Sequence, residues 1–185
     1  MPQLFIIAGP NGAGKTTAAK TILPETLAIK EFVNADEIAR GLSPFNPDGV
    51  SFEAGRIMLK RIQQLVTEKK DFAIETTLSL KSYMRLIKDV QQKDYIVTLL
   101  FLWLNNADIA KFRVAKRVAE GGHNIPLDVI HRRYLRGLQN LKGYISIVDA
   151  WFVYDNSRGE YELIAKKSGE TKEIINFETW QRILP

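Results

Sequence analysis

A short segment near the N-terminus carries residue types that bind the phosphates of a nucleotide. Residues 9–17 read GPNGAGKTT, which fits the pattern G-x-x-x-x-G-K-[ST]. The segment follows an apolar run at Leu4–Ala8 and opens a predicted helix at Thr16–Ile22, the context that such a loop needs. Glycines let the backbone turn successive N–H groups inward, and the helix N-terminus adds positive potential. The sequence therefore predicts binding of a nucleoside triphosphate.

Within this phosphate loop, the lysine is predicted to reach the phosphates and the first threonine hydroxyl to bind Mg²⁺. The predicted nucleotide-binding residues are Gly9, Pro10, Asn11, Gly12, Ala13, Gly14, Lys15, Thr16 and Thr17, with Thr16 as the metal ligand. A glycine-rich turn without a ligand is the alternative, and the strand, the spacing, the lysine and the threonine together argue against it. The loop does not distinguish ATP from GTP. Asn156, after the last predicted core strand, is a candidate contact for the base.

Two predicted strands end in polar side chains, one before Asp36 and the other at Glu75 and Thr77. Ligands of open α/β sheets bind at the carboxyl ends of the strands. We interpret Asp36 as the general base that takes the proton of an acceptor hydroxyl. Asp36, Glu75 and Thr77 are predicted to bind the acceptor substrate. Capping of the following helices, by Asp36 in one case and by Thr77 or Ser79 in the other, is the alternative interpretation.

Basic side chains gather between residues 105 and 140, which we predict to form a helical lid. A helix, a break at Gly121 and Gly122, and a second helix from Leu127 make up this segment. His123 follows the break and is predicted to contact the substrate. The alternative interpretation is that His123 is an ordinary turn residue. An excess of positive charge suits an anionic small substrate, and most of these side chains are expected to be solvated.

Three arginines of the lid are predicted to be catalytic, because arginine stabilises the charge that develops on a transferring phosphoryl group. Arg117 is the first candidate, followed by Arg133 and Arg113. Arg113 and Arg117 lie four residues apart and share a helical face. Arg133 borders the apolar stripe of the second helix.

Composition narrows the function classes further. The chain has 185 residues, a formal net charge of +5, no cysteine and two histidines. Disulfide frameworks, thiolate zinc sites and cysteine nucleophiles are therefore excluded. No apolar run approaches the ~20 residues that span a bilayer, so we expect a cytoplasmic protein without membrane association. Neither the N-K-x-D element of GTPases nor the L-S-G-G-Q stretch of transporter ATPases is present.

The order of the predicted elements indicates an α/β fold. Apolar runs without alternation are typical of buried parallel strands, and they alternate here with helical stretches. We predict one domain over residues 1–185: a P-loop NTPase three-layer sandwich with a mainly parallel five-stranded sheet, the lid and a C-terminal β-hairpin. The predicted strands are Leu4–Ala8, Glu31–Asn34, Phe72–Thr76, Tyr95–Leu104 and Trp151–Tyr154, and the hairpin adds Tyr161–Lys166 before a helix at Phe177–Leu184.

Four segments in this order resemble the zeta-toxin family of P-loop kinases: GPNGAGKTT, VNADEIA, ETTLS and RVAEGGHNIP. The resemblance covers roughly residues 3–157. It implies phosphorylation of UDP-N-acetylglucosamine by ATP or GTP, and a small antitoxin as partner. It also implies that Asp36 is the base, that Glu75 and Thr77 bind substrate, and that Arg117 is the first lid arginine.

The chain departs from the pattern at the second lid arginine, where it has the Gly-Gly-His123 segment, and Arg133 is the predicted replacement. The kinase activity is therefore implied more strongly than the UDP-sugar or toxicity. A polynucleotide 5′-hydroxyl kinase is an alternative, although few aromatic residues for base stacking accompany the lid, so nucleic acid is an unlikely partner. A non-catalytic, nucleotide-gated regulatory module is the other alternative.

Overall fold

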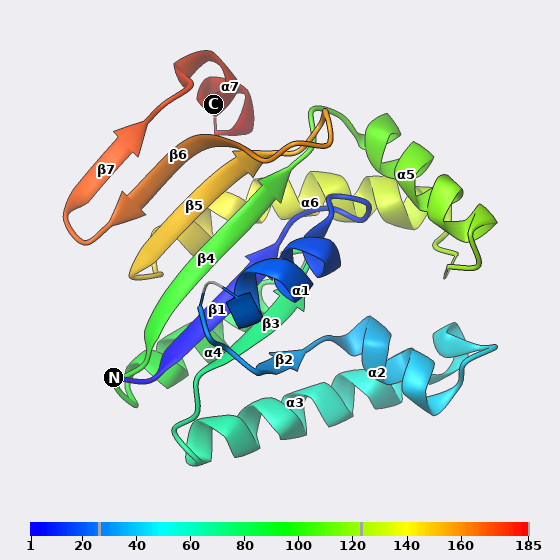
Figure 1. The fold of residues 1–185 in the computed structure, drawn as a ribbon, viewed down its shortest axis with the longest axis horizontal. Coiled ribbons are helices and arrows are strands. Elements are labelled where there is room, and N and C mark those ends of the chain that lie inside the picture. The colour runs from blue at the N-terminus through cyan, green and yellow to red at the C-terminus, as the bar shows by residue number, and fades with distance from the viewer. Residues whose placement is uncertain (26, 123, 185) are drawn as a thin grey trace.

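The computed structural model describes residues 1–25, 27–122 and 124–184, and it places a seven-stranded mixed sheet at the centre of the molecule (Figure 1). The strand order is β2-β3-β1-β4-β5-β6-β7. The strands are β1 Gln3–Ala8, β2 Glu31–Val33, β3 Phe72–Thr76, β4 Ile96–Trp103, β5 Ala150–Asp155, β6 Glu162–Ser168 and β7 Thr171–Ile174.

The first five strands are parallel and form the core of the sheet. In β1, Leu4 and Ile6 pack on one face while Phe5 and Ile7 pack on the other. Burial on both faces explains why these strands read as continuous apolar runs. The register aligns Ala8 with Thr76 of β3, so the carboxyl ends of these strands lie side by side.

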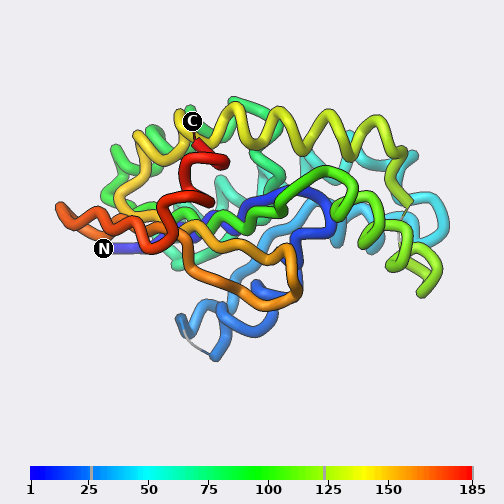
Figure 2. Tube along the Cα trace, turned by 90° about the horizontal axis from the view of Figure 1, so that it is seen from above, coloured from blue at the N-terminus to red at the C-terminus, as the bar shows by residue number. Residues whose placement is uncertain are grey.

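Helices cover both faces of the sheet, and together with it they make three layers (Figure 2). The helix α1 (Lys15–Glu25) lies on one face, and α6 (Leu127–Ile145) lies on the opposite face. The helices α3 (Ser51–Thr67), α4 (Ser82–Gln91) and α7 (Phe177–Ile183) contribute buried side chains to the same core cluster as α6. This layering leaves the carboxyl edge of the parallel strands accessible for a ligand site.

Three further elements surround that edge. The helix α2 (Ala35–Leu42) and a short 3-10 helix η1 (Pro47–Val50) follow β2. The helix α5 (Ala107–Ala119) follows β4 and packs on α6 through a second core cluster that contains Val114 and Ile130. The predicted lid is therefore a pair of helices with its own apolar contact.

The structure confirms the predicted α/β fold, the five parallel strands, the lid and the antiparallel pairing of β5 with β6. The structure also contains β7, which was not predicted. The sequence carries no signal for this strand because three of the four residues Thr171–Ile174 are exposed at the sheet edge and show no apolar pattern. The capping alternatives were wrong: Asn34, not Asp36, caps α2, and α4 begins after Lys81 without a side-chain cap. Among the described residues, no helix is both long enough and apolar enough to cross a membrane.

Candidate nucleotide and acceptor site

The phosphate loop joins β1 to α1 with a backbone that requires glycine at three of the predicted positions, the first being Gly9 with a φ of +144°. Gly12 and Gly14 have φ angles of +77° and +84°, which L side chains rarely adopt. A Cβ at Gly14 would lie 2.9 Å from the Asn156 side chain, and a Cβ at Gly12 would lie 3.0 Å from the carbonyl oxygen of Ala110. The loop is thus closely packed beneath α5 and the turn between β5 and β6.

Lys15 lies at the inner side of this loop, with only 6% of its surface exposed. Its ammonium group donates a hydrogen bond to the Pro10 carbonyl (2.9 Å) and lies 3.7 Å from a Glu75 carboxylate oxygen. Burial lowers the pKa of Lys15, an effect that nearby Glu75 and Asp36 oppose and that Arg117 and Arg133 reinforce. Lys15 lines one cavity with Arg113 and Arg117 and a second with Arg133, so positive charge gathers around its ammonium group and favours an anionic ligand.

Glu75, at the end of β3, connects the phosphate loop to the end of β2. Its Oε2 atom accepts hydrogen bonds from the Thr16 hydroxyl (2.8 Å) and from the Asn34 side-chain amide (2.7 Å). Its other oxygen faces Lys15. A carboxylate at this depth requires such partners, because an unpaired buried charge is costly. Glu75 therefore organises the loop that was predicted to hold the phosphates.

The same pair of side chains suits a magnesium ion. Mg²⁺ prefers oxygen ligands and is held in such sites by one or two protein groups together with the phosphates of the substrate. The Thr16 hydroxyl and the Glu75 carboxylate lie within hydrogen-bonding distance of each other in the cavity wall. The Thr16 hydroxyl fits the ion as a direct ligand, and the Glu75 carboxylate fits it as an adjacent negative charge.

Asn34 is a site residue that the sequence analysis missed. Its side-chain oxygen accepts the N–H groups of Asp36 (2.8 Å) and Glu37 (3.3 Å), and so it caps α2 while its amide nitrogen binds Glu75. The sequence carries a signal for this role, because Asn34 stands three residues before Glu37, as in a capping box. The cap fixes the first turn of α2, which carries Asp36.

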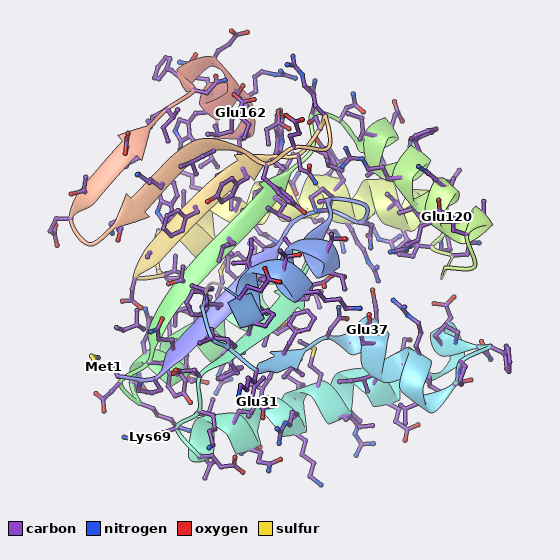
Figure 3. All side chains as sticks on the ribbon, in the orientation of Figure 1. Met1, Glu31, Glu37, Lys69, Glu120 and Glu162 are labelled. Atoms are coloured by element: carbon purple, nitrogen blue, oxygen red, sulfur yellow. The ribbon has the colours of Figure 1, made fainter. Side chains whose placement is uncertain are left out.

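Asp36 projects from that first turn to the point where three cavities meet. It lines one cavity of about 340 Å³ with the phosphate loop, a second of about 400 Å³ beneath the lid, and a third of about 180 Å³ beside β3. Its neighbour Glu37, which is labelled on α2 in Figure 3, also lines the first of these cavities, and its carboxylate lies 3.9 Å from the ammonium group of Lys20 in α1. We refer to these as the phosphate cavity, the lid cavity and the β3 cavity.

The lid cavity and the β3 cavity contain the predicted acceptor-binding residues and several others. Thr77, Ser79 and Tyr83 line the β3 cavity with Glu75, so the structure brings Glu75 and Thr77 together. Arg133 lines both cavities and therefore faces the region around Asp36. The lid cavity was not predicted; its wall includes Ile125, Pro126, Val129, Arg132 and Ser51.

The other two predicted arginines both line the phosphate cavity from α5. Arg113 donates to the carbonyls of Gly12 (3.4 Å) and Ser157 (3.0 Å), so its guanidinium group braces the loop. Arg117 lies one turn further along α5 and contributes to the electrostatic environment of Lys15. His123 lies outside the described residues. The candidate base contact Asn156 donates its amide to the Ala13 carbonyl (2.9 Å).

A phosphate loop at the carboxyl edge of a mainly parallel sheet, with a neighbouring strand-end carboxylate and a basic helical lid, defines the class of P-loop kinase folds. The model of the family described as zeta toxin matches residues 1–167 of the chain. The chain therefore belongs to the zeta toxin family.

Solved structures share the fold. The AvrRxo1-ORF1:-ORF2 structure with ATP has a TM-score of 0.84 at 18% identity, over 99% of this chain and 63% of that chain. A structure from the PezAT chromosomal toxin-antitoxin system of Streptococcus pneumoniae has a TM-score of 0.74 at 17% identity, over 99% of this chain and 78% of that chain. The chain thus spans less than two thirds of the length of the chain that it matches in the AvrRxo1-ORF1:-ORF2 structure.

A relative by sequence is an uncharacterized protein of Haemophilus influenzae, which is 29% identical over 132 residues. These residues make up 71% of this chain and 92% of the relative. The similarity extends beyond the phosphate loop alone.

Proposed function

We propose that the chain is a kinase that transfers the γ-phosphate of ATP or GTP, as its Mg²⁺ complex, to a hydroxyl group of an anionic small molecule. The observation that carries this proposal is the position of Asp36, which lines the phosphate cavity, the lid cavity and the β3 cavity. A carboxylate placed between a nucleotide-binding loop and two further cavities is where a kinase needs its base.

The residues of the phosphate cavity would bind and neutralise the donor. The N–H groups at the start of α1 and the Lys15 ammonium group would hold the β- and γ-phosphates. Thr16, with Glu75 beside it, would hold Mg²⁺, and the ion would offset the negative charge of the phosphates. Arg117 and Arg133 would face the charge that develops on the phosphoryl oxygens.

Asp36 would orient the acceptor hydroxyl and take its proton. The hydroxyl oxygen forms a bond to the γ-phosphorus, the bond from that phosphorus to the β,γ-bridging oxygen breaks, and the nucleoside diphosphate leaves with the electron pair. The proton of the hydroxyl goes to the Asp36 carboxylate. Closure of α5 over the phosphate cavity would exclude water, so that transfer competes successfully with hydrolysis.

The two acceptor cavities favour a substrate with an anionic part and a hydroxyl-bearing part. Arg132 and Arg133 lie in the lid cavity with apolar side chains around them, and Thr77 and Ser79 supply hydroxyl groups in the β3 cavity. A UDP-activated amino sugar such as UDP-N-acetylglucosamine has both parts, and it is the acceptor that we propose.

Incubation of the purified chain with MgATP and a panel of acceptors tests this proposal. The panel contains UDP-sugars, nucleosides and 5′-hydroxyl oligonucleotides, and mass spectrometry detects the added phosphate. We expect a phosphorylated UDP-amino sugar. We expect Asp36→Asn to lower the transfer rate by about 10²–10⁴-fold while MgADP binding is retained. Asp89→Asn, on an exposed site of α4, is the matched control and should leave the rate unchanged.

Other outcomes of this panel have definite meanings. Phosphate on an oligonucleotide would show that the acceptor is a polynucleotide 5′-hydroxyl group and not a sugar hydroxyl. Full activity in Asp36→Asn would show that Asp36 is not the general base. MgADP binding without transfer to any panel member would contradict the UDP-sugar assignment.

We further propose that the chain acts as a toxin with a small antitoxin as partner, as in the toxin-antitoxin system to which the PezAT structure belongs. Induced expression of the chain in a bacterial host tests toxicity. Arrest of growth that Asp36→Asn abolishes is the expected result. Normal growth with the active chain would contradict the toxin role and leave the kinase proposal standing.

A further inference from the structure

The phosphate loop is held from outside by side chains of the second half of the chain. Three consecutive carbonyls of the loop accept hydrogen bonds: Gly12 from Arg113 (3.4 Å), Ala13 from Asn156 (2.9 Å) and Gly14 from the Tyr161 hydroxyl (3.2 Å). Arg113 belongs to α5, whereas Asn156 and Tyr161 flank the turn between β5 and β6. The C-terminal hairpin thus contacts the loop at two successive peptide groups.

These contacts fix the orientation of the peptide groups that face the phosphates. A trans peptide places its carbonyl and the following N–H group on opposite sides of the chain. When Asn156 holds the Ala13 carbonyl outward, the N–H of Gly14 points inward. The Gly14 carbonyl accepts the Ala18 N–H of α1 (2.9 Å) as well as the Tyr161 hydroxyl (3.2 Å), and the two bonds together leave the N–H of Lys15 pointing the other way, at the first turn of α1 where helix N–H groups lack intrahelical acceptors.

The packing around Asn156 shows that the contact is closely fitted. Asn156 is 5% exposed, and its amide nitrogen lies 2.9 Å from the position that a Cβ of Gly14 would occupy. The Tyr161 hydroxyl lies 3.0 Å from the same position. Gly14 has a φ of +84°, which L side chains rarely adopt, and both side chains meet the glycine where it has no side chain of its own.

We infer that Asn156 and Tyr161 are positioning residues of the nucleotide site: the hairpin between β5 and β6 preorganises the phosphate loop for a nucleoside diphosphate or triphosphate. The inference rests on the proposed nucleotide binding and deepens it. A loop held in its binding conformation loses less conformational entropy when the ligand binds, so removal of either contact weakens nucleotide affinity. The acceptor and the chemical step are not involved.

Isothermal titration of the full chain with MgADP tests the inference without any need for an acceptor. Asn156→Ala should raise the Kd about tenfold, which corresponds to about 1.4 kcal/mol and is the scale of one hydrogen bond. Tyr161→Phe, which removes only the hydroxyl of an exposed side chain, should raise the Kd about threefold at an unchanged melting temperature.

Two matched variants separate positioning from general stability. Asn140, 8% exposed, also donates its amide to a backbone carbonyl, that of Leu78 (2.8 Å). Asn140→Ala should lower the melting temperature as Asn156→Ala does, but should leave the MgADP Kd at the wild-type value. Tyr154, the nearby tyrosine of β5, is not hydrogen-bonded to the phosphate loop in the described part of the chain, and Tyr154→Phe should also keep the wild-type Kd.

Amide hydrogen exchange supplies a second readout. Faster exchange in the peptide that covers residues 9–17 is expected in Asn156→Ala and Tyr161→Phe and not in the two controls. Wild-type Kd values in both hairpin variants would overturn the inference while leaving nucleotide binding intact. If Asn140→Ala weakened MgADP binding as much as Asn156→Ala does, the loss of affinity would follow from lower stability and not from a lost positioning contact, which would overturn the inference. A wild-type chain that does not bind MgADP would overturn the inference and the proposed function together.

Discussion

At the scale of single residues, the site depends on carboxylates whose surroundings differ. Glu75 is enclosed by Thr16, Asn34 and Lys15, whereas the neighbouring carboxylate of Asp36 is solvent-exposed where the cavities meet. An enclosed carboxylate organises positive and hydroxyl groups, and an exposed one is available to a substrate proton. This difference leads us to assign Glu75 to the metal and the loop, and Asp36 to the acceptor.

The first prediction concerns Glu75. Glu75→Gln keeps the shape of the side chain but removes the charge beside Thr16 and Lys15. We expect the affinity for MgADP to fall about tenfold or more, the scale of one charge-assisted hydrogen bond, while the affinity for ADP in EDTA changes little. Titrations with and without Mg²⁺ measure both. An equal loss in the two conditions would show that Glu75 acts on the loop and not on the metal.

At the scale of elements, helix caps connect stability to the site. Asn34 caps α2 and Asn106 caps α5, each by accepting two backbone N–H groups. Only at Asn34 does the same side chain also donate to Glu75 (2.7 Å). The same substitution at Asn34 and at Asn106 therefore separates the effect of the helix cap from the effect of the hydrogen bond to Glu75.

Aspartate caps helices as well as asparagine does, so the two Asn→Asp changes isolate the amide group. We expect Asn106→Asp to change the free energy of unfolding by less than about 0.5 kcal/mol. Asn34→Asp places a second carboxylate against Glu75 and should cost about 2 kcal/mol, with reduced MgADP affinity. Chemical denaturation and titration measure these effects. Equal stability of the two variants would show that the bond to Glu75 adds nothing.

The packing of α6 on the loop after β3 gives another prediction. A Cβ at Gly137 would lie 2.6 Å from the Thr77 carbonyl oxygen, whereas a Cβ at Gly143 would meet the flexible end of Met84 at 2.7 Å. Gly137→Ala should therefore displace the Thr77 loop, destabilise the protein by about 1–3 kcal/mol and raise the acceptor KM. Gly143→Ala should be neutral or gain about 0.5–1 kcal/mol from helix propensity. Thermal unfolding and acceptor kinetics test the pair, and a neutral Gly137→Ala would contradict the close contact.

At the scale of the whole molecule, the nucleotide site draws on both halves of the chain. The phosphate loop lies near the N-terminus, α5 covers it from the middle of the chain, and the β5–β6 hairpin contacts it from the second half. Nucleotide binding should consequently stabilise the entire domain and not a local segment.

This linkage is measurable by thermal unfolding. At an MgADP concentration of about 100 times the Kd, binding should add about 2.7 kcal/mol to the free energy of unfolding and raise the melting temperature in one cooperative transition. Lys15→Ala removes the ammonium group from the phosphate cavity and should abolish the shift. Two separate transitions, with only one responding to MgADP, would show that the halves unfold independently.

The sequence by itself determined the features that depend on adjacent residues. The phosphate loop was predictable because a strand, two glycines, a lysine and a threonine stand within one short segment, and the parallel strands because burial on both faces leaves continuous apolar runs. The lid was predictable from helical periodicity around the break at Gly121. Zeta toxin family membership likewise follows from motifs in linear order.

Only the tertiary structure decided which distant residues meet. Thr16 and Glu75 are 59 residues apart, and Asn156 and Ala13 are 143 apart, yet each pair is hydrogen-bonded. Which side chains meet at the carboxyl edge is set by the strand order β2-β3-β1-β4-β5, and no local pattern encodes that order. The lid cavity and the support of the phosphate loop by the hairpin arise in the same way, from elements that become neighbours only when the sheet has formed.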